Sequence, residues 1–349
     1  MNLSLFELLT SLLFPLLVKA AVYKEIECYI GQDFLDPEKF TFFSDSDPTH
    51  GRVNYVNATV AKEANLAFVS DSGWGPGSTF IARADYTTVL DPDGPGRNSV
   101  RMSSNQFFNS SVVVIDLQHM PQGCGTWPAI WTLGNDWPQN GEIDIVEGVN
   151  NQLFNQATLH TNPNCTMPAT GRPQTGTSLG NDCDVNANFN EGCGVAFDNG
   201  TFGPGFNDAG GGWFAMERTL EFIQVWFWPR ASRTVPSVVR NGSPIVETQN
   251  WGTPQAYFPN TQCDLATEFG PNQIIFDLTL CGDWAGQDLV YAASGCPSTC
   301  TDFVNNNPEA FKEAYFEFNS IRVYQPRQAY NANPSANRHR RLNHANGVH

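Results

Sequence analysis

Acidic and aliphatic residues alternate in the stretch Gly141-Glu142-Ile143-Asp144-Ile145-Val146-Glu147-Gly148. In a β-strand successive side chains point to opposite faces, so Glu142 and Asp144 share one face while the isoleucines share the other. A regular strand would place Glu147 on the aliphatic face, because its offset from Glu142 is odd. One extra residue at Ile145 or Val146, a β-bulge, returns Glu147 to the acidic face. The stretch therefore predicts a bulged strand with three carboxylates on one face.

Further segments rich in β-branched and aromatic residues recur along the chain, separated by turn signals such as Asn241-Gly242. They are Arg52–Val60, Ser99–Met102, Ser111–Leu117, Ala157–Thr161, Thr219–Phe227, Gln273–Leu280 and Tyr315–Tyr324. Because no amphipathic helices alternate with them, the sequence predicts an all-β sandwich. Residues 162–212, rich in Asn, Gly and Cys, are expected to form disulfide-tied surface loops.

The two ends of the chain differ in composition from this body. Residues 1–21 predict a secretory signal peptide, since Leu3 to Val18 is mostly apolar and Val18-Lys19-Ala20 resembles a cleavage site. A membrane anchor is the alternative, but the apolar run is short for one. Residues 22–327 are expected to form the β-sandwich domain. Residues 328–349 are polar, lack a hydrophobic pattern, and predict a disordered tail.

The net charge limits the possible partners. The chain carries a formal charge of −16 at pH 7, and charged residues make up only 15% of it. An acidic surface repels phosphate backbones and anionic lipids, so we expect no nucleic-acid partner and no stable membrane insertion. A neutral substrate is compatible with this charge.

Sequons and cysteines both indicate export. Five sequons predict glycosylation in the mature chain, at Asn57, Asn109, Asn164, Asn199 and Asn241. The nine cysteines would mostly pair in an oxidising compartment, and the odd number leaves at least one free or bonded to another chain. The sequence leaves the connectivity open. We expect a protein that is secreted and is extracellular or associated with a cell wall.

Clustered carboxylates of this kind suit glycoside hydrolysis, in which one attacks the anomeric carbon and another, of raised pKa, protonates the leaving oxygen. A solvated edge strand or a calcium-binding face are the alternatives. Three tryptophans lie directly upstream, Trp127, Trp131 and Trp137, and aromatic rings stack on the apolar faces of sugars. Together with the acids, they favour a sugar-binding cleft.

Several separated motifs resemble glycoside hydrolase family 16, and more narrowly the fungal laminarinase-like endo-β-1,3(4)-glucanases. The resemblance covers roughly Phe34 to Gln325. It is carried by Gly125–Ala129, Trp131, Gly141–Asn150, Thr158–Thr161, Val225–Arg230, Ile274–Asp277, Cys281–Gly286 and Asn319–Tyr324.

This resemblance implies a β-jelly-roll sandwich of concanavalin-like type, with a concave substrate cleft and a retaining double displacement. By position in the motif, Glu142 is the expected nucleophile, Glu147 the general acid/base, and Asp144 the carboxylate that orients the nucleophile. No cofactor is expected and no metal site is assigned. The expected substrate-binding residues are Trp127, Trp131, Trp137, His160 and Trp284.

The implied activity is endo-hydrolysis of β-1,3 or mixed β-1,3/1,4 glucans, by a protein expected to be a monomer. Two alternatives remain at this point. A cell-wall glucan transglycosylase would use the same carboxylates, with a sugar acceptor in place of water. A non-catalytic carbohydrate-binding protein could share the fold, because fold does not fix function, although simple sugar binding does not need three acids.

Overall fold

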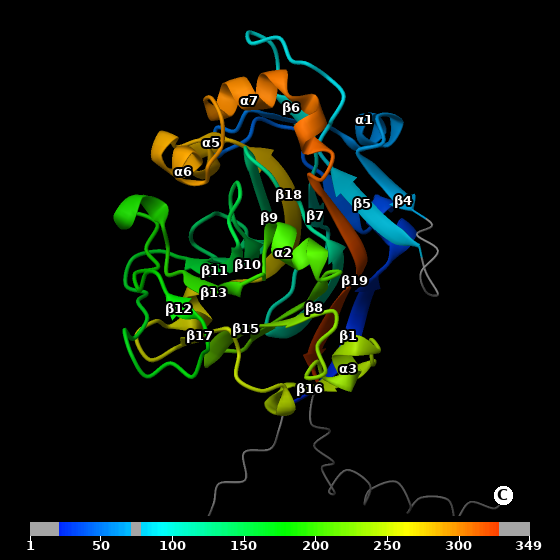
Figure 1. Cartoon of the computed structure of the whole chain (residues 1–349). Coiled ribbons are helices and arrows are strands. Elements are labelled where there is room, and N and C mark those ends of the chain that lie inside the picture. The colour runs from blue at the N-terminus through cyan, green and yellow to red at the C-terminus, as the bar shows by residue number, and fades with distance from the viewer. Residues whose placement is uncertain (1–20, 71–77, 328–349) are drawn as a thin grey trace, which may run out of the picture.

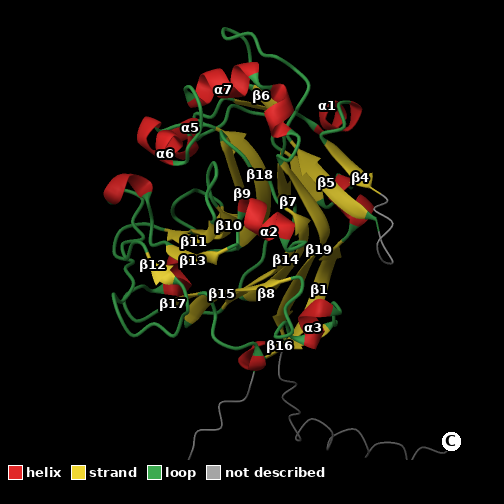
Figure 2. Ribbon diagram, viewed as in Figure 1, coloured by secondary structure: helices red, strands yellow, loops and turns green. Residues whose placement is uncertain are grey.

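Two large antiparallel sheets lie face to face across the core of the computed structural model, which describes residues 21–70 and 78–327 (Figures 1 and 2). The predicted all-β sandwich is confirmed. The predicted signal peptide, apart from Ala21, and the predicted tail over 328–349 lie outside the described residues.

The first sheet has the strand order β16-β1-β19-β8-β14-β15-β17, with β5 pairing with β19 and β4 with β5. Its strands are β1 (Val22–Tyr29), β4 (Ala67–Ser70), β5 (Thr79–Arg83), β8 (Ser111–His119), β14 (Gly212–Arg218), β15 (Phe222–Pro229), β16 (Ile245–Glu247), β17 (Ala256–Pro259) and β19 (Tyr315–Pro326).

The second sheet has the order β12-β13-β11-β10-β9-β18-β7-β2. Its strands are β2 (Phe40–Phe42), β7 (Arg101–Ser104), β9 (Thr126–Gly134), β10 (Glu142–Glu147), β11 (Phe154–His160), β12 (Thr177–Ser178), β13 (Val195–Asn199) and β18 (Asn272–Leu280). A small parallel pair joins β3 (Val53–Tyr55) to β6 (Arg97–Ser99). The acidic stretch is thus β10, in the middle of the second sheet.

The helices are short and lie outside the sandwich (Figure 2). They are α1 (Ala58–Glu63), α2 (Gly203–Asp208), α3 (Ser237–Arg240), α4 (Leu265–Glu268), α5 (Gly282–Ala285), α6 (Asp288–Ala293) and α7 (Cys300–Asn306), with 3₁₀ turns at η1 (Gly31–Leu35), η2 (Asn188–Asn190), η3 (Thr248–Asn250) and η4 (Pro308–Phe311). Within the described ranges, no helix has the length and apolarity needed to cross a bilayer.

Two predicted strands are partly wrong: Ser99–Met102 is divided between β6 and β7, and Arg52–Val60 is a strand only at its start. Of Arg52–Val60, only the residues of β3 form a strand, and helix α1 begins before the segment ends. The side chain of Asn57 accepts a hydrogen bond from the backbone N–H of Val60 at 3.1 Å and so caps the helix. This capping outweighs the β-propensity of the valines.

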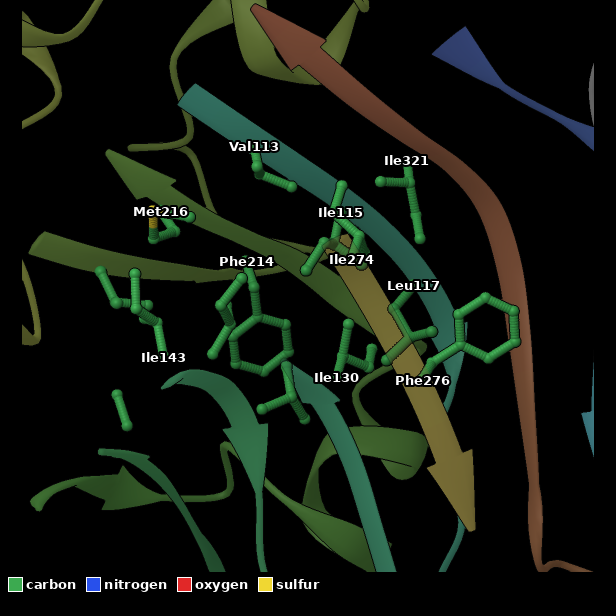
Figure 3. Packing of buried hydrophobic residues seen from close by; sticks show 14 of the residues in the cluster. Val113, Ile115, Leu117, Ile130, Ile143, Phe214, Met216, Ile274, Phe276 and Ile321 are labelled. Carbon is green, nitrogen blue, oxygen red and sulfur yellow. The ribbon is translucent and has the colours of Figure 1, made fainter. Parts of the chain in front are cut away.

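Aliphatic and aromatic side chains from both sheets fill the space between them (Figure 3). Ile143 of β10 and Ile130 of β9 both enter this core, where Phe214 and Met216 of β14 meet them from the other sheet. Burying these side chains stabilises the sandwich by roughly 1.5–3 kcal/mol each. The aliphatic face of β10 is therefore held in the core, which fixes the orientation of its acidic face.

Disulfides tie the connections to the sandwich. Within the described residues the pairs are Cys124–Cys296, Cys165–Cys263, Cys183–Cys193 and Cys281–Cys300, and Cys28 is free. The prediction that most cysteines pair, with one left over, is confirmed. Two of the pairs anchor the stretch 162–212, where β12, β13 and α2 interrupt the predicted loops.

Candidate active site

A β-bulge in β10 places its three acids on one face. Opposite β9, Asp144 pairs with Trp131, but Val146 pairs with the very next residue, Ile130. Ile145 is therefore the extra residue, and Glu147 lies opposite Ala129. Because Ala129 and Trp131 are two residues apart on a regular strand, they share a face, and so do the acids opposite them. The predicted bulge is confirmed.

The acidic face forms the floor of a cleft of about 920 Å³. This cleft crosses the strands of the second sheet, from β7 and β18 over β9 and β10 to β11 and the loop before β13. The structure brings together all eight residues that the sequence predicted for catalysis or substrate binding, and each lines the cleft: Trp127, Trp131, Trp137, Glu142, Asp144, Glu147, His160 and Trp284.

Glu142 and Glu147 each accept a hydrogen bond from a tryptophan. The indole N–H of Trp137 donates to Glu142 at 2.5 Å, and that of Trp127 donates to Glu147 at 2.9 Å. Burial raises the pKa of Glu142 to about 7, although the bond from Trp137 and the charge of Arg101 oppose it. Burial likewise raises the pKa of Glu147 to about 7, against the bond from Trp127. Both acids can therefore change protonation near neutral pH.

Asp144 lies between these two acids and is almost fully buried. Burial raises its pKa well above the usual range, and the neighbouring charges of Glu142 and Glu147 raise it further. A protonated Asp144 donates its hydroxyl to the carboxylate of Glu142, a hydrogen bond that favours the charged form of Glu142. The arrangement thus keeps one acid neutral in order to stabilise the ionised form of its neighbour.

His160 lies directly opposite Glu142 on β11. Its Nδ1 is 2.9 Å from Oδ1 of Asn190, and its Nε2 lies 3.5 Å from Oδ2 of Asp144. Burial lowers the pKa of this imidazole, so the ring is neutral at pH 7. Because Asn190 accepts the proton on Nδ1, Nε2 presents its lone pair to Asp144.

Trp284 lies at the Glu147 end of the cleft. Its ring meets that of Trp127 edge to face, with centroids 5.7 Å apart. Trp137, at the Glu142 end, is 44% exposed, so its ring faces solvent in the cleft. Aromatic surfaces therefore flank the acids at both ends of β10.

Two polar cleft residues, Asp277 and Arg101, were not predicted as site residues. Asp277 on β18 accepts hydrogen bonds from Trp131 at 2.7 Å and from the hydroxyl of Tyr55 at 2.8 Å. Arg101 on β7 pairs with Asp277 across the sheet and stacks over Trp131 at 5.0 Å. Burial raises the pKa of Asp277, while the charge of Arg101 lowers it. These residues come together only because their strands pair, and their spacing along the chain does not reveal this pairing.

Donor atoms of Glu142, Asp144 and His160 lie within 4.8 Å of one another, close enough to hold a cation. The expectation of no cofactor and no metal stays a prediction.

Sequence comparisons assign a family to most of the chain. Residues 40–324 match the family described as the XgeA-like catalytic GH16 domain. A probable glycosidase of Schizosaccharomyces pombe is 44% identical over 88% of this chain and 70% of its own length. The endo-1,3(4)-beta-glucanase xgeA of Emericella nidulans is 40% identical over 90% of this chain and 50% of its own length. The chain thus spans about half the length of the curated endo-1,3(4)-beta-glucanases that it matches.

Solved structures agree with this assignment. Laminarinase 16A from Phanerochaete chrysosporium, a GH16 protein solved with beta-glucans in donor and acceptor sites, is 51% identical and has a TM-score of 0.83. The match covers 87% of this chain and 100% of that one. An elongating GH family 16 beta-1,3-glucosyltransferase is 41% identical over the same shares, with a TM-score of 0.79. The predicted jelly-roll fold is confirmed.

Proposed function

The chain belongs to the family of XgeA-like catalytic GH16 domains, and we propose that it is a retaining endo-β-glucanase acting on β-1,3 or mixed β-1,3/1,4 glucans. The observation that carries this proposal is the bulge at Ile145, which puts Glu142, Asp144 and Glu147 on the floor of one cleft. The activities named for the similar glucanase and laminarinase support the substrate class. The catalytic domain is proposed to span residues 22–327.

Glu142 acts as the nucleophile in this proposal. Its ionised carboxylate attacks the anomeric carbon, and a glycosyl ester forms as the bond to the leaving oxygen breaks. Glu147, protonated, gives its proton to that oxygen, and the shortened glucan leaves. Glu147, now ionised, takes a proton from water, which attacks the same carbon and releases Glu142. Two displacements on opposite faces retain the anomeric configuration.

The electrostatics of the cleft suit these two roles. The site holds three acids, and their mutual repulsion in a buried setting favours fewer than three charges. The proposed mechanism needs a proton on Glu147 at the start, and the hydrogen bond from Asp144 favours the ionised form of Glu142. The pKa of about 7 at Glu147 lets it act as an acid first and as a base afterwards.

Transglycosylation is a second candidate, favoured by the similar elongating glucosyltransferase. There a sugar hydroxyl would replace water in the second displacement, and the same three acids would serve. A purely carbohydrate-binding role is disfavoured. Three clustered acids whose charges are not balanced by nearby cations lower the stability of the fold, and sugar binding alone gains nothing from them.

Purified protein incubated with laminarin and with barley-type mixed-linkage glucan tests the proposal. Chromatography would follow the products, and early proton NMR would give their anomeric form. We expect shorter oligosaccharides released in the β-configuration, lost in Glu142→Gln and Glu147→Gln. Products longer than the oligosaccharides supplied would move the assignment to transglycosylation, and glucan binding without any product would contradict both.

We further propose that the protein is a secreted glycoprotein. The asparagines of all five sequons are exposed, so none is hidden by the fold from a glycosyltransferase. The disulfides fit an oxidising compartment. Intact-mass measurement before and after enzymatic removal of N-glycans tests this, and an unchanged mass would contradict it.

A further inference from the structure

A short loop closed by the Cys183–Cys193 disulfide lines one end of the cleft. At its tip, three consecutive residues have positive φ angles, namely Asn188 at 47°, Phe189 at 58° and Asn190 at 63°. Asparagine tolerates this conformation, whereas a bulky residue such as phenylalanine rarely adopts it. The backbone is thus held at Phe189 in a conformation that its side chain disfavours.

The side chain of Phe189 is fully exposed, yet it lines the cleft. It therefore contributes little to the core, and exposing a phenyl ring to water is itself unfavourable. Leu220 and Leu289 are also strongly exposed, but they lie outside the cleft. Within the described residues, the same holds for every large apolar side chain other than Phe189 that is at least as exposed as Leu220. A strained, exposed aromatic at the rim of a substrate cleft indicates a functional role better than a structural one.

Contacts of the loop show where its tip lies relative to the catalytic acids. The next residue, Asn190, accepts the hydrogen bond from Nδ1 of His160, which lies opposite Glu142. Leu179, also exposed and also lining the cleft, adds a second apolar side chain to this rim. The loop leads into β13, so the ring lies beyond β11, whereas Arg101 lies at the other end of the cleft on β7.

We propose that Phe189 is a sugar-stacking residue that binds a glucose unit of the β-glucan chain at the β11–β13 end of the cleft, away from the scissile bond. This inference rests on the proposed function, because a glucan lying across β10 would reach the ring. An aromatic face matches the apolar face of a glucopyranose, and the disulfide and the hydrogen bond of Asn190 hold the loop that carries Phe189 in place. Phe189 would then help to set the preferred chain length of the substrate.

Kinetics on laminari-oligosaccharides of increasing length test the proposal, with Phe189→Ala and Phe189→Trp compared with the wild type. We expect Phe189→Ala to raise KM roughly tenfold for long chains and to leave both kcat and the shortest cleaved chain unchanged. Phe189→Trp should stay close to the wild type. Leu220→Ala, which removes an exposed apolar side chain outside the cleft, is the matched control.

An equal KM for Phe189→Ala and wild type on every chain length would overturn the proposal. A loss of kcat on all chain lengths would also overturn it, because the substitution would then have acted on His160 by disturbing its hydrogen bond to Asn190. A binding experiment tests the inference independently of the proposed function. In it, Glu142→Gln and Glu142→Gln/Phe189→Ala are titrated with a long laminari-oligosaccharide. Weaker binding by the double variant supports Phe189 even if the wild type cleaves nothing, and equal binding contradicts it.

Discussion

Each of the two sheets buries a carboxylate, but the sheets treat it in opposite ways. Glu217 on β14 and Asp144 on β10 are both only 2% exposed. Glu217 accepts hydrogen bonds from the hydroxyl of Tyr23 at 2.6 Å and from the amide of Gln224 at 2.7 Å. Asp144 has acids on both sides, and its Oδ2 has no hydrogen-bond partner. Burial is therefore common to both carboxylates, and incomplete pairing distinguishes Asp144 from Glu217.

This contrast has a physical reason. A buried carboxylate is tolerated when hydrogen bonds replace its lost water, as at Glu217. In the cleft, burial removes water from Glu142 and Glu147, and their hydrogen bonds replace it only in part. The pKa values of both acids are therefore raised, and the cleft above them has room for a substrate. We therefore expect substitutions in the first sheet to lower stability and those in the cleft to lower activity.

The largest expected effect comes from removing either catalytic acid. Glu142→Gln and Glu147→Gln should each lower kcat by at least ~10³-fold, because no other group can attack or protonate in their place. Glu217→Gln is the matched control, equally a buried glutamate. It should retain kcat and lose roughly 1–3 kcal/mol of unfolding free energy. Comparable kcat in all three variants would remove the distinction between the two sheets.

Replacement of Asp144 should be milder when a neutral donor remains. Since its raised pKa keeps Asp144 protonated, Asp144→Asn preserves both the neutral state and a hydrogen-bond donor to Glu142. We expect kcat to fall roughly 10- to 100-fold, and Asp144→Ala to fall further. A loss in Asp144→Asn as large as in Glu142→Gln would indicate that Asp144 acts as an anion.

The pH dependence of stability sharpens the comparison. Burial raises the pKa values of Glu142 and Glu147 from 4.5 to about 7, so the folded state holds their protons more tightly than the unfolded state. Their stabilising contribution is complete below about pH 4.5 and is lost as the pH rises through about 7. Glu147→Gln should therefore be more stable than the wild type at pH 8, by roughly 1–3 kcal/mol.

Urea unfolding at pH 4 and pH 8 measures this difference. At pH 4 the two proteins should have nearly equal free energies of unfolding. Glu217→Gln, in contrast, should be less stable than the wild type at pH 8. If Glu147→Gln were destabilised at pH 8, the acid would be well solvated in the folded state and its proposed role would lose its electrostatic basis.

The smallest effect is expected at the tryptophans. Trp131→Phe removes the N–H donor to Asp277 and part of the cleft surface, so KM for laminarin should rise roughly threefold to tenfold. Trp226→Phe removes a comparable bond, from the indole N–H of a residue in the first sheet to the carbonyl of Gly252 in the loop before β17. It should lower the midpoint of thermal unfolding and leave KM unchanged. The reverse pattern would contradict the comparison.

Much of the catalytic strand was predictable from the sequence. Alternation along Gly141–Gly148 indicated a strand, and the odd offset of Glu147 demanded a bulge, because three acids on one face and aliphatics on the other admit few alternatives. Strands β8, β18 and β19 also match predicted segments. These are long runs of strand-forming residues. Their side chains are either apolar on both faces of the strand or alternate clearly between apolar and polar.

Other elements lacked such a signal. Strand β9 contains Pro128, and β14 begins at the last residue of the run Gly210–Gly212, so neither has a clear strand pattern. Asp277 and Asn190 reach the site through strand pairing and a disulfide-closed loop, which bring together residues distant in the chain. Local patterns carry no information on such long-range contacts.

Trapping the covalent intermediate tests the central claim most directly. Wild-type protein would be treated with a laminari-oligosaccharide donor that carries fluorine at C2 and a reactive leaving group at C1, then digested and analysed by mass spectrometry. The account predicts one glycosyl adduct, on the carboxylate of Glu142, and none in Glu142→Gln. An adduct on Glu147 or Asp144, or turnover with inversion and no adduct, would contradict it.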